Sequence, residues 1–249
     1  MRSILVAAPR ESASLPSFRR TLAHLAYTAE NGELLRSEAF DARTKGGILG
    51  FFCRAEHFPC SDAFCRALVQ ECRTRGYEGV LADISGVRTQ RSVSALENLA
   101  TALLRDGLRL YVPLPHAVSG AHILVCTALS GGTLEEHLAE CAARFGAAKL
   151  ALDCQRLLMD FTLPCRRGEG KPLTHKECEH LRTRVGSPVF FSRELCCNYF
   201  SYCVDGKAHF VAFDTAETLR RKMALAERIG ISTAFFMFPE VRDILGELF

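Results

Sequence analysis

The chain has 249 residues, of which 48% are hydrophobic and 24% are charged, and its formal net charge is +3. This composition is too apolar for a disordered chain, and the length suits one (β/α)8 barrel or two smaller domains. No long basic run is present, which argues against nucleic-acid binding, because that function usually requires a basic stripe.

The N-terminal apolar run, residues 4–8, is too short for a secretory signal, and Arg10 and Glu11 interrupt it at once. No stretch approaches the roughly 20 apolar residues that span a bilayer. We therefore expect a cytoplasmic protein, inside the cell or spore that makes it, with no membrane partner.

Short apolar runs alternate with amphipathic segments along the chain, which predicts parallel strands connected by helices. We expect strands at residues 4–8, 34–40, 47–53, 80–84, 108–114, 123–129, 149–154, 157–163 and 232–238. We expect helices at residues 16–31, 61–75, 93–105, 133–146, 174–185 and 215–230. Several of these helices begin at a Ser or Thr N-cap and end at a glycine.

The last third of the chain interrupts this alternation. Residues 198–203 and 208–213 flank Asp205-Gly206, which is a hairpin-turn signal. The economical interpretation is a single α/β domain spanning residues 1–249, a (β/α)8 TIM barrel with an inserted antiparallel hairpin near residues 198–213. The region before Cys53 is short for three strands and their helices, so a trimmed barrel stays open.

The twelve cysteines are expected to be reduced thiols that pack as small hydrophobic side chains, because no signal peptide is predicted. A vicinal disulfide between Cys196 and Cys197 is a remote alternative. One group combines metal-binding residue types: Cys53, His57, Cys60 and Cys65. Its spacing fits no standard zinc pattern, so we predict no metal and no cofactor.

In a barrel of this kind the active site lies at the carboxyl ends of the strands. Residues 76–85 end one predicted strand and read Gly-Tyr-Glu-Gly-Val-Leu-Ala-Asp-Ile-Ser. This segment resembles the fourth-strand signature of glycoside hydrolase family 18, the chitinase-like family, which is acidic-Gly-x-x-x-Asp-x-Glu. Glu78 takes the first acidic position and Asp83 takes the aspartate. Ser85 stands where the resemblance places the catalytic glutamate.

The C-terminal third is similar to the spore-cortex branch of this family, whose members are N-acetylglucosaminidases that act on peptidoglycan. The similar features are Phe200-x-Tyr202 and His209-x-Val211-x-Phe213 in the predicted hairpin. The strand at residues 157–164 resembles the seventh strand of that branch, which ends in a proline. The resemblance covers about residues 60–243.

The departures from the family pattern are concentrated where the chemistry belongs. In the family, the glutamate protonates the leaving oxygen, and the aspartate two residues before it orients the acetamido group that acts as nucleophile. A serine is too weak an acid to replace the glutamate, which costs roughly 10²–10⁴-fold in rate. The family's sixth strand ends in Met-x-Tyr-Asp, and its expected counterpart, residues 150–153, has Leu152 in place of the tyrosine. Met237 replaces the tryptophan that floors the sugar site.

The leading hypothesis is a non-catalytic barrel that binds an N-acetylglucosamine-containing glycan or a protein partner. Its candidate ligand-binding residues are Asp83, Asp153, Met237 and Glu240. Asp83 and Asp153 also allow a second interpretation, as buried strand-end aspartates that hydrogen bonds satisfy. A competing hypothesis is an active glycosidase whose general acid has moved to Glu240, Glu194 or Glu78. A third is a function of the cysteines that depends on a thiol or a metal.

Overall fold

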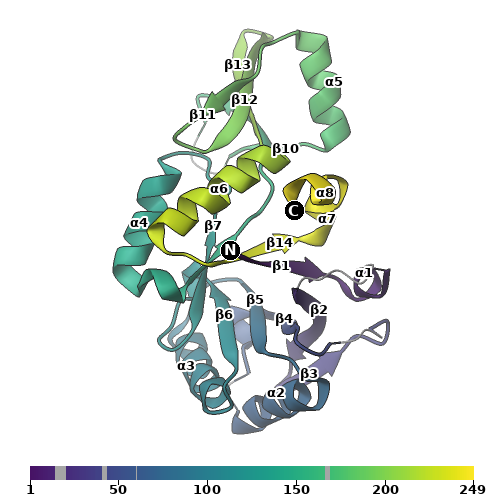
Figure 1. The fold of residues 1–249 in the computed structure, drawn as a ribbon, viewed down its shortest axis with the longest axis vertical. Coiled ribbons are helices and arrows are strands. Elements are labelled where there is room, and N and C mark those ends of the chain that lie inside the picture. The colour runs from purple at the N-terminus through teal and green to yellow at the C-terminus, as the bar shows by residue number, and fades with distance from the viewer. Residues whose placement is uncertain (15–20, 41–43, 60, 166–168) are drawn as a thin grey trace.

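Eight parallel strands form a closed barrel in this computed structural model, which describes residues 1–14, 21–40, 44–59, 61–165 and 169–249 (Figure 1). The strands are β1 (Arg2–Ala7), β2 (Thr21–Glu30), β4 (Ile48–Arg54), β5 (Gly79–Ser85), β6 (Arg109–Pro113), β7 (His122–Cys126), β8 (Leu150–Asp153) and β14 (Thr233–Met237). The barrel closes because β1 pairs with β14 on one side and with β2 on the other. The predicted (β/α)8 fold is confirmed, and the trimmed barrel is wrong.

The second strand, β2, occupies Thr21–Glu30, within the helix that was predicted at residues 16–31, and residues 16–20 of that prediction lie outside the described part of the chain. The side chains of β2 are apolar on both faces, with Ala23 buried inside the barrel and Ala26 buried against the outer core. A strand buried on both faces has no period-2 alternation, so its pattern resembles that of a buried helix. Asn31 and Gly32 both have positive φ and form the turn into β3 (Glu33–Arg36), an antiparallel partner of β2.

The helices pack outside the barrel (Figure 1). They are α1 (Pro9–Ser14), α2 (Asp62–Arg75), α3 (Gln90–Arg105), α4 (Leu134–Phe145), α5 (His175–Val185), α6 (Ala216–Ile229), α7 (Phe238–Val241) and α8 (Leu245–Leu248). Short 3-10 helices occupy Ala55–His57, Leu114–His116, Ala147–Lys149 and Arg242–Ile244. The predicted caps form at Ser61, Thr174 and Thr215, each accepting a backbone N–H bond, whereas Thr133 precedes α4 without a side-chain bond. None of the described helices is long and apolar enough to cross a membrane.

The barrel interior is filled by one inward-facing row from every strand: Ile4, Val6, Ala23, Ile48, Leu81, Tyr111, Leu124, Ala151 and Phe235. Side chains two residues apart on a strand lie on the same face. Therefore Asp83, Asp153 and Met237, each two residues beyond a member of this row, also face inward at the carboxyl end of the barrel.

A five-stranded antiparallel sheet is inserted between β8 and β14, and it lies at the top of Figure 1 together with α5. Its order is β10 (Lys171–Pro172), β9 (Leu158–Leu163), β13 (Lys207–Phe213), β12 (Cys197–Val204) and β11 (Phe190–Ser192). The predicted hairpin, now β12 and β13, is therefore confirmed as part of a larger sheet. The strand predicted at residues 157–163 exists as β9, but its assignment as the seventh barrel strand is wrong, because β8 is the seventh.

The hairpin residues that resemble the spore-cortex branch have a structural explanation. The Tyr202 hydroxyl donates to Asp160 Oδ2 at 2.8 Å, and His209 Nδ1 lies 3.0 Å from Asp160 Oδ1. The Tyr202 and His209 rings stack with centroids 4.5 Å apart. Phe200 and Val211 are buried in the same hydrophobic cluster as the inner side of α5. These residues therefore hold the inserted sheet together.

A fully buried ion pair joins the inserted sheet, α6 and the barrel. Lys222 Nζ donates to Asp214 Oδ2 at 2.7 Å and to the Thr127 carbonyl at 3.1 Å. The Asp214 carboxylate also accepts from the Leu157 backbone N–H at 2.9 Å and from the Thr218 hydroxyl at 2.8 Å. Neither charged side chain is exposed to solvent. Sequence analysis missed this pair, because nothing local distinguishes Lys222 from a surface lysine.

Candidate functional site

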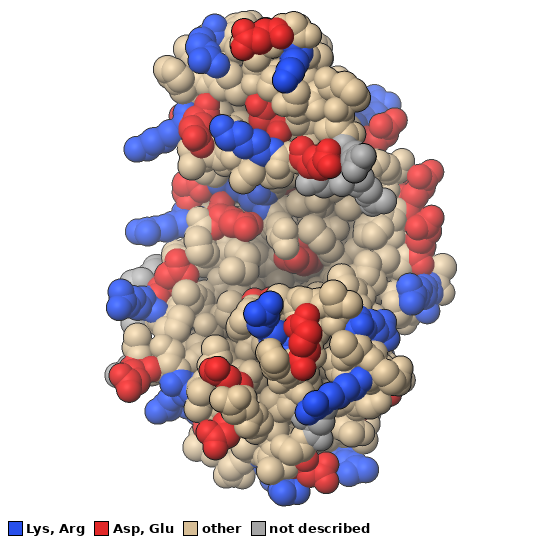
Figure 2. All heavy atoms as spheres, turned by 180° about the vertical axis from the view of Figure 1, so that it is seen from behind, with Lys and Arg blue, Asp and Glu red and all other residues tan. Residues whose placement is uncertain are grey.

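A cavity of about 350 Å³ opens at the carboxyl ends of the barrel strands, and we call it the mouth cavity. It is lined by Val6, Leu25, Leu81, Ala82, Asp83, Pro113, Leu124, Asp153, Gln155, Phe235, Met237 and Glu240. The structure thus brings together all four predicted ligand-binding residues. Figure 2 shows a hollow in the molecular surface below the inserted sheet, with an acidic side chain at its floor.

Asp83 projects into the mouth cavity from β5. Burial raises the pKa of its carboxyl above the ordinary value. No described residue donates a hydrogen bond to this carboxyl. The interpretation of Asp83 as a strand-end aspartate whose carboxyl is satisfied by hydrogen bonds is therefore not supported. The Asp83 carboxyl is therefore available to a ligand.

Asp153 and Glu240 face the same cavity. Burial raises the pKa of Asp153 to about 6, and the negative charges of Glu240 and Asp83 add to this effect. The Gln155 amide opposes it by donating to Asp153 Oδ2 at 2.8 Å. Glu240 Oε2 accepts from the Arg156 backbone N–H at 2.9 Å, and burial raises its pKa as well. The mouth cavity therefore brings three carboxyls together, and no Lys, Arg or His is among its described lining residues.

Replacement of Asp153 by asparagine is expected to stabilise the protein near pH 7. Because the pKa is raised from 3.8 to about 6 in the folded state, the stability that Asp153 contributes is present below pH 3.8 and is lost as the pH rises through 6. Asp153→Asn should then raise the free energy of unfolding at pH 7 by about 1–3 kcal/mol and leave it nearly unchanged near pH 4. Urea unfolding at both pH values measures this difference.

The control for this experiment is Glu97→Gln, which removes an exposed carboxyl from α3 and should leave stability unchanged at both pH values. A wild-type protein as stable at pH 7 as Asp153→Asn would contradict an uncompensated charge at Asp153. A gain confined to pH 7 would mark this carboxyl as kept for function at the expense of stability.

The other predicted site residues are not among the described residues that line the mouth cavity. Ser85 ends β5 two residues beyond Asp83 and is exposed. Glu78 precedes β5 at the opposite end of the barrel, where it accepts from Arg2 Nη2 at 2.9 Å. Glu194 lies in the turn between β11 and β12 and is not among the residues that line the mouth cavity. Glu78 is therefore too far from this site to be its relocated acid, because a strand's two ends lie on opposite sides of the barrel. Glu194 is not placed at the mouth cavity by its described lining.

The strand count corrects one further prediction. β7 is the sixth barrel strand and β8 is the seventh, so residues 150–153 are not the counterpart of the family's sixth strand. With the strand of Asp83 counted as the fourth, the strand predicted at residues 123–129 is already the sixth, and the assignment of residues 150–153 passed over it. The sixth strand ends at Cys126, and the residues that follow it are Thr127 and Ala128. Neither is a tyrosine or an aspartate.

Two further cavities adjoin the mouth cavity and were missed by sequence analysis. One, of about 360 Å³, shares Leu25 and Asp83 with it and includes Phe52, which is 41% exposed. The other, of about 550 Å³, shares Gln155 and Glu240 and extends to the inserted sheet. Phe52 lies four residues beyond inward-facing Ile48, so strand alternation was a usable signal for it. No local signal marks Gln155, which follows β8 in a loop.

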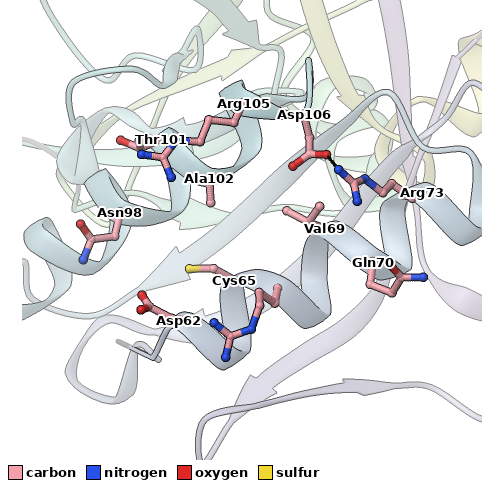
Figure 3. Close-up of a pocket in the computed structure, with 11 residues that line it drawn as sticks. Asp62, Cys65, Val69, Gln70, Arg73, Asn98, Thr101, Ala102, Arg105 and Asp106 are labelled. Atoms are coloured by element: carbon pink, nitrogen blue, oxygen red, sulfur yellow. Dashed lines mark hydrogen bonds and ion pairs between the residues drawn. The ribbon is translucent and has the colours of Figure 1, made fainter.

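The outer surface of the barrel has a groove of about 650 Å³ between α2 and α3 (Figure 3). Its walls mix both charge signs, and Arg73 forms an ion pair with Asp106 across it. This groove shares no lining residue with the mouth cavity, and its mixture of three arginines and two aspartates favours no particular ligand.

No described group of three or more His, Cys, Asp or Glu side chains is placed to hold a metal ion, and Cys60 of the predicted group lies outside the described residues. The cysteines that the structure describes are free thiols, including Cys196 and Cys197, so the vicinal disulfide is wrong. Burial raises the pKa of Cys53, Cys154 and Cys197, which disfavours the thiolate form that reacts as a nucleophile.

Comparison with known proteins identifies the fold. No protein-family model and no curated protein matches the sequence. Among solved structures, the spore cortex-lytic enzyme SleL of Bacillus cereus has a TM-score of 0.69 at 16% identity, covering 100% of this chain and 74% of that one. A class V chitinase mutant from Cycas revoluta in complex with (GlcNAc)3 has a TM-score of 0.66 at 12% identity, covering 100% and 98%. A chitinase from Chromobacterium violaceum has a TM-score of 0.61 at 17% identity, covering 95% and 94%.

These structures are of the two kinds that the sequence motifs resemble, the spore-cortex enzymes and the chitinases. The fold predicted from that resemblance is therefore confirmed. At such low identity the likeness establishes the architecture, and the activity has to be argued from the residues of the mouth cavity.

Proposed function

We propose that this chain is a glycan-binding barrel that has lost the hydrolytic chemistry of the proteins whose fold it shares. The observation behind this proposal is the pairing of Ser85 with Asp83. The strand end that the resemblance assigns to the general acid has a hydroxyl, while the neighbouring carboxyl still faces an open cavity. The site is therefore suited to holding a sugar and unsuited to protonating its leaving oxygen.

The shape and lining of the mouth cavity support binding. Ligand sites are typically apolar concavities with a few placed polar groups. Here the walls include Leu25, Phe235 and Met237, and the polar groups are three carboxyls and the Gln155 amide. The adjoining cavities give room for more than one sugar unit. The Cycas revoluta chitinase, which has the same fold, was crystallised with (GlcNAc)3, and this supports a hexosamine glycan as the ligand.

The loss of hydrolysis is supported at two more positions. The sixth strand offers no tyrosine at Ala128 to assist an acetamido nucleophile, and the resemblance assigns a tryptophan to the position of Met237. Ser85→Glu would restore a carboxyl at the position of the general acid and would leave the changes at Ala128 and Met237 in place. For the wild type we expect no turnover of chitooligosaccharides or peptidoglycan above an uncatalysed control.

The test combines a hydrolysis assay with calorimetric titration of amino-sugar tetramers. Asp83→Asn keeps the shape of the side chain and removes its charge, so it should weaken binding by about tenfold or more, as expected for a hydrogen bond to a charged group. Glu78→Gln, at the other end of β5, is the matched control and should bind like the wild type. Wild-type hydrolysis that Asp83→Asn abolishes would refute the non-catalytic function.

An active glycosidase with a relocated acid is the second candidate, and one observation favours it. Asp153 has a pKa of about 6, which suits a general acid near neutral pH. Glu240 faces the same cavity, and burial raises its pKa as well. This candidate predicts turnover with a bell-shaped pH profile that Asp153→Asn or Glu240→Gln eliminates.

A protein partner remains a third kind of ligand for the same face. It is supported if no glycan binds and a protein changes the fluorescence of a dye attached near the mouth cavity, for example at a cysteine substituted for Ser85. Binding of a glycan that Asp83→Asn weakens would decide against it.

A further inference from the structure

The charged side chains that line the mouth cavity are all acidic. Its described lining includes the carboxyls of Asp83, Asp153 and Glu240 and no Lys, Arg or His side chain. Two guanidinium groups line the adjoining cavities, and each faces another partner. Arg156 donates to the Glu240 carbonyl at 2.9 Å and to Asp243 Oδ1 at 2.6 Å, and Arg36 lies 4.0 Å from Glu71 Oε1. Among the described residues that line the mouth cavity itself, a ligand therefore meets three carboxyl groups and no cationic side chain.

The three carboxyls differ in how well the protein satisfies them. Glu240 accepts from the Arg156 backbone N–H, and Asp153 accepts from the Gln155 amide. Asp83 accepts no hydrogen bond from any described residue. A protonated amine offers three donors and a positive charge, whereas an acetamide offers one donor and no charge. An amine satisfies this cavity better because charge-assisted hydrogen bonds are the stronger kind.

The features that would favour an acetamide are missing from the same cavity. No tyrosine is among its described lining residues. Tyr27 lines the adjoining cavity of about 360 Å³, but its hydroxyl already donates to Glu71 Oε1 at 2.8 Å. The floor position is occupied by Met237, a thioether with only weak acceptor capacity. The Gln155 amide is the one neutral side-chain N–H donor among the described lining residues, and one of its two N–H groups is already given to Asp153.

We propose that the mouth cavity selects a glycan unit with a free, protonated amino group, such as glucosamine in a de-N-acetylated chain, over the N-acetylated unit. This inference rests on the proposed function and names the ligand class of the same site. The ammonium lies against Asp83 and Asp153, and the remaining sugar units extend into the adjoining cavities. Because the attraction between unit charges falls steeply in water, the preference should be moderate, about tenfold or more.

The experiment compares two ligands that differ only at nitrogen. The glucosamine tetramer and the N-acetylglucosamine tetramer are titrated into the full chain by calorimetry at about pH 6, where an amino group is protonated. Titrations at low and at raised salt separate a seated cation from diffuse attraction, which salt screens. We expect the glucosamine tetramer to bind about tenfold tighter or more at both salt concentrations.

Variants assign this preference to the cavity. Asp83→Asn should remove most of the preference and leave the N-acetylated tetramer less affected. Glu97→Gln on α3 removes one exposed negative charge and should change neither affinity. Circular dichroism and thermal unfolding check that both variants are folded.

Each outcome decides a separate point. If the N-acetylated tetramer binds as tightly as the free amine or tighter, the inference is overturned and the proposed function stands. If neither tetramer binds the wild type, the proposed function falls and the inference falls with it. If the preference survives Asp83→Asn or disappears at raised salt, the amine is attracted by general charge, and the inference is overturned.

Discussion

Lys222→Met is expected to lower the free energy of unfolding by about 3–5 kcal/mol, the usual cost of removing one partner of a buried ion pair. The variant leaves the Asp214 carboxylate buried without its cation, and it leaves the Thr127 carbonyl without its Lys222 donor. The Asp214 carboxylate stays away from solvent because it is fully buried, and its hydrogen bonds from the Leu157 backbone and the Thr218 hydroxyl hold it in place. Equilibrium urea unfolding measures the loss.

The matched control is the neighbouring residue. Arg221 pairs with Glu217 at 2.6 Å, and both side chains are more than half exposed, so Arg221→Met should cost at most about 1 kcal/mol. A double variant, Lys222→Met with Asp214→Asn, should recover part of the loss because it removes the stranded charge. If Lys222→Met cost no more than Arg221→Met, the pair would not be the junction between inserted sheet and barrel that the contacts indicate.

Phe51→Ala is expected to cost about 3–5 kcal/mol, the typical value for truncating a buried phenylalanine. Phe51 has no exposed surface and lies between β4 and the outer helices. Its ring centroid is 6.1 Å from that of Phe58 and 5.9 Å from that of Phe64, so the substitution removes edge contacts and leaves a cavity. Denaturant unfolding with circular dichroism detection measures the change.

Phe190→Ala tests the same chemical change on the surface. Phe190 is 49% exposed on β11, the edge strand of the inserted sheet, and contacts Tyr199 at a centroid distance of 5.6 Å. We expect a cost of about 1 kcal/mol or less. Equal losses for the two variants would contradict the placement of the main hydrophobic core between the barrel and its helices.

Much of the fold was predictable because its signals are local. The helices α2, α5 and α6 follow from a capping residue and a glycine C-cap, which act within a few residues. The hairpin of β12 and β13 follows from Asp205-Gly206, whose positive φ values confirm the turn. β2 was mispredicted because a strand buried on both faces has no local period, and only its pairing with β1 and β4 makes it a strand.

The candidate site also combines features that follow from local sequence with features that depend on the tertiary structure. The sequence by itself determined that Asp83 and Asp153 end strands and that Ser85 stands where a glutamate was expected, because strand ends and motif positions are local properties. Only the tertiary structure decided that these carboxyls meet Glu240 and Gln155 around one cavity, and that Glu78 lies at the opposite end of the barrel. Barrel closure brings together segments far apart in the chain, and it is set by pairings such as β1 with β14 that no local pattern encodes.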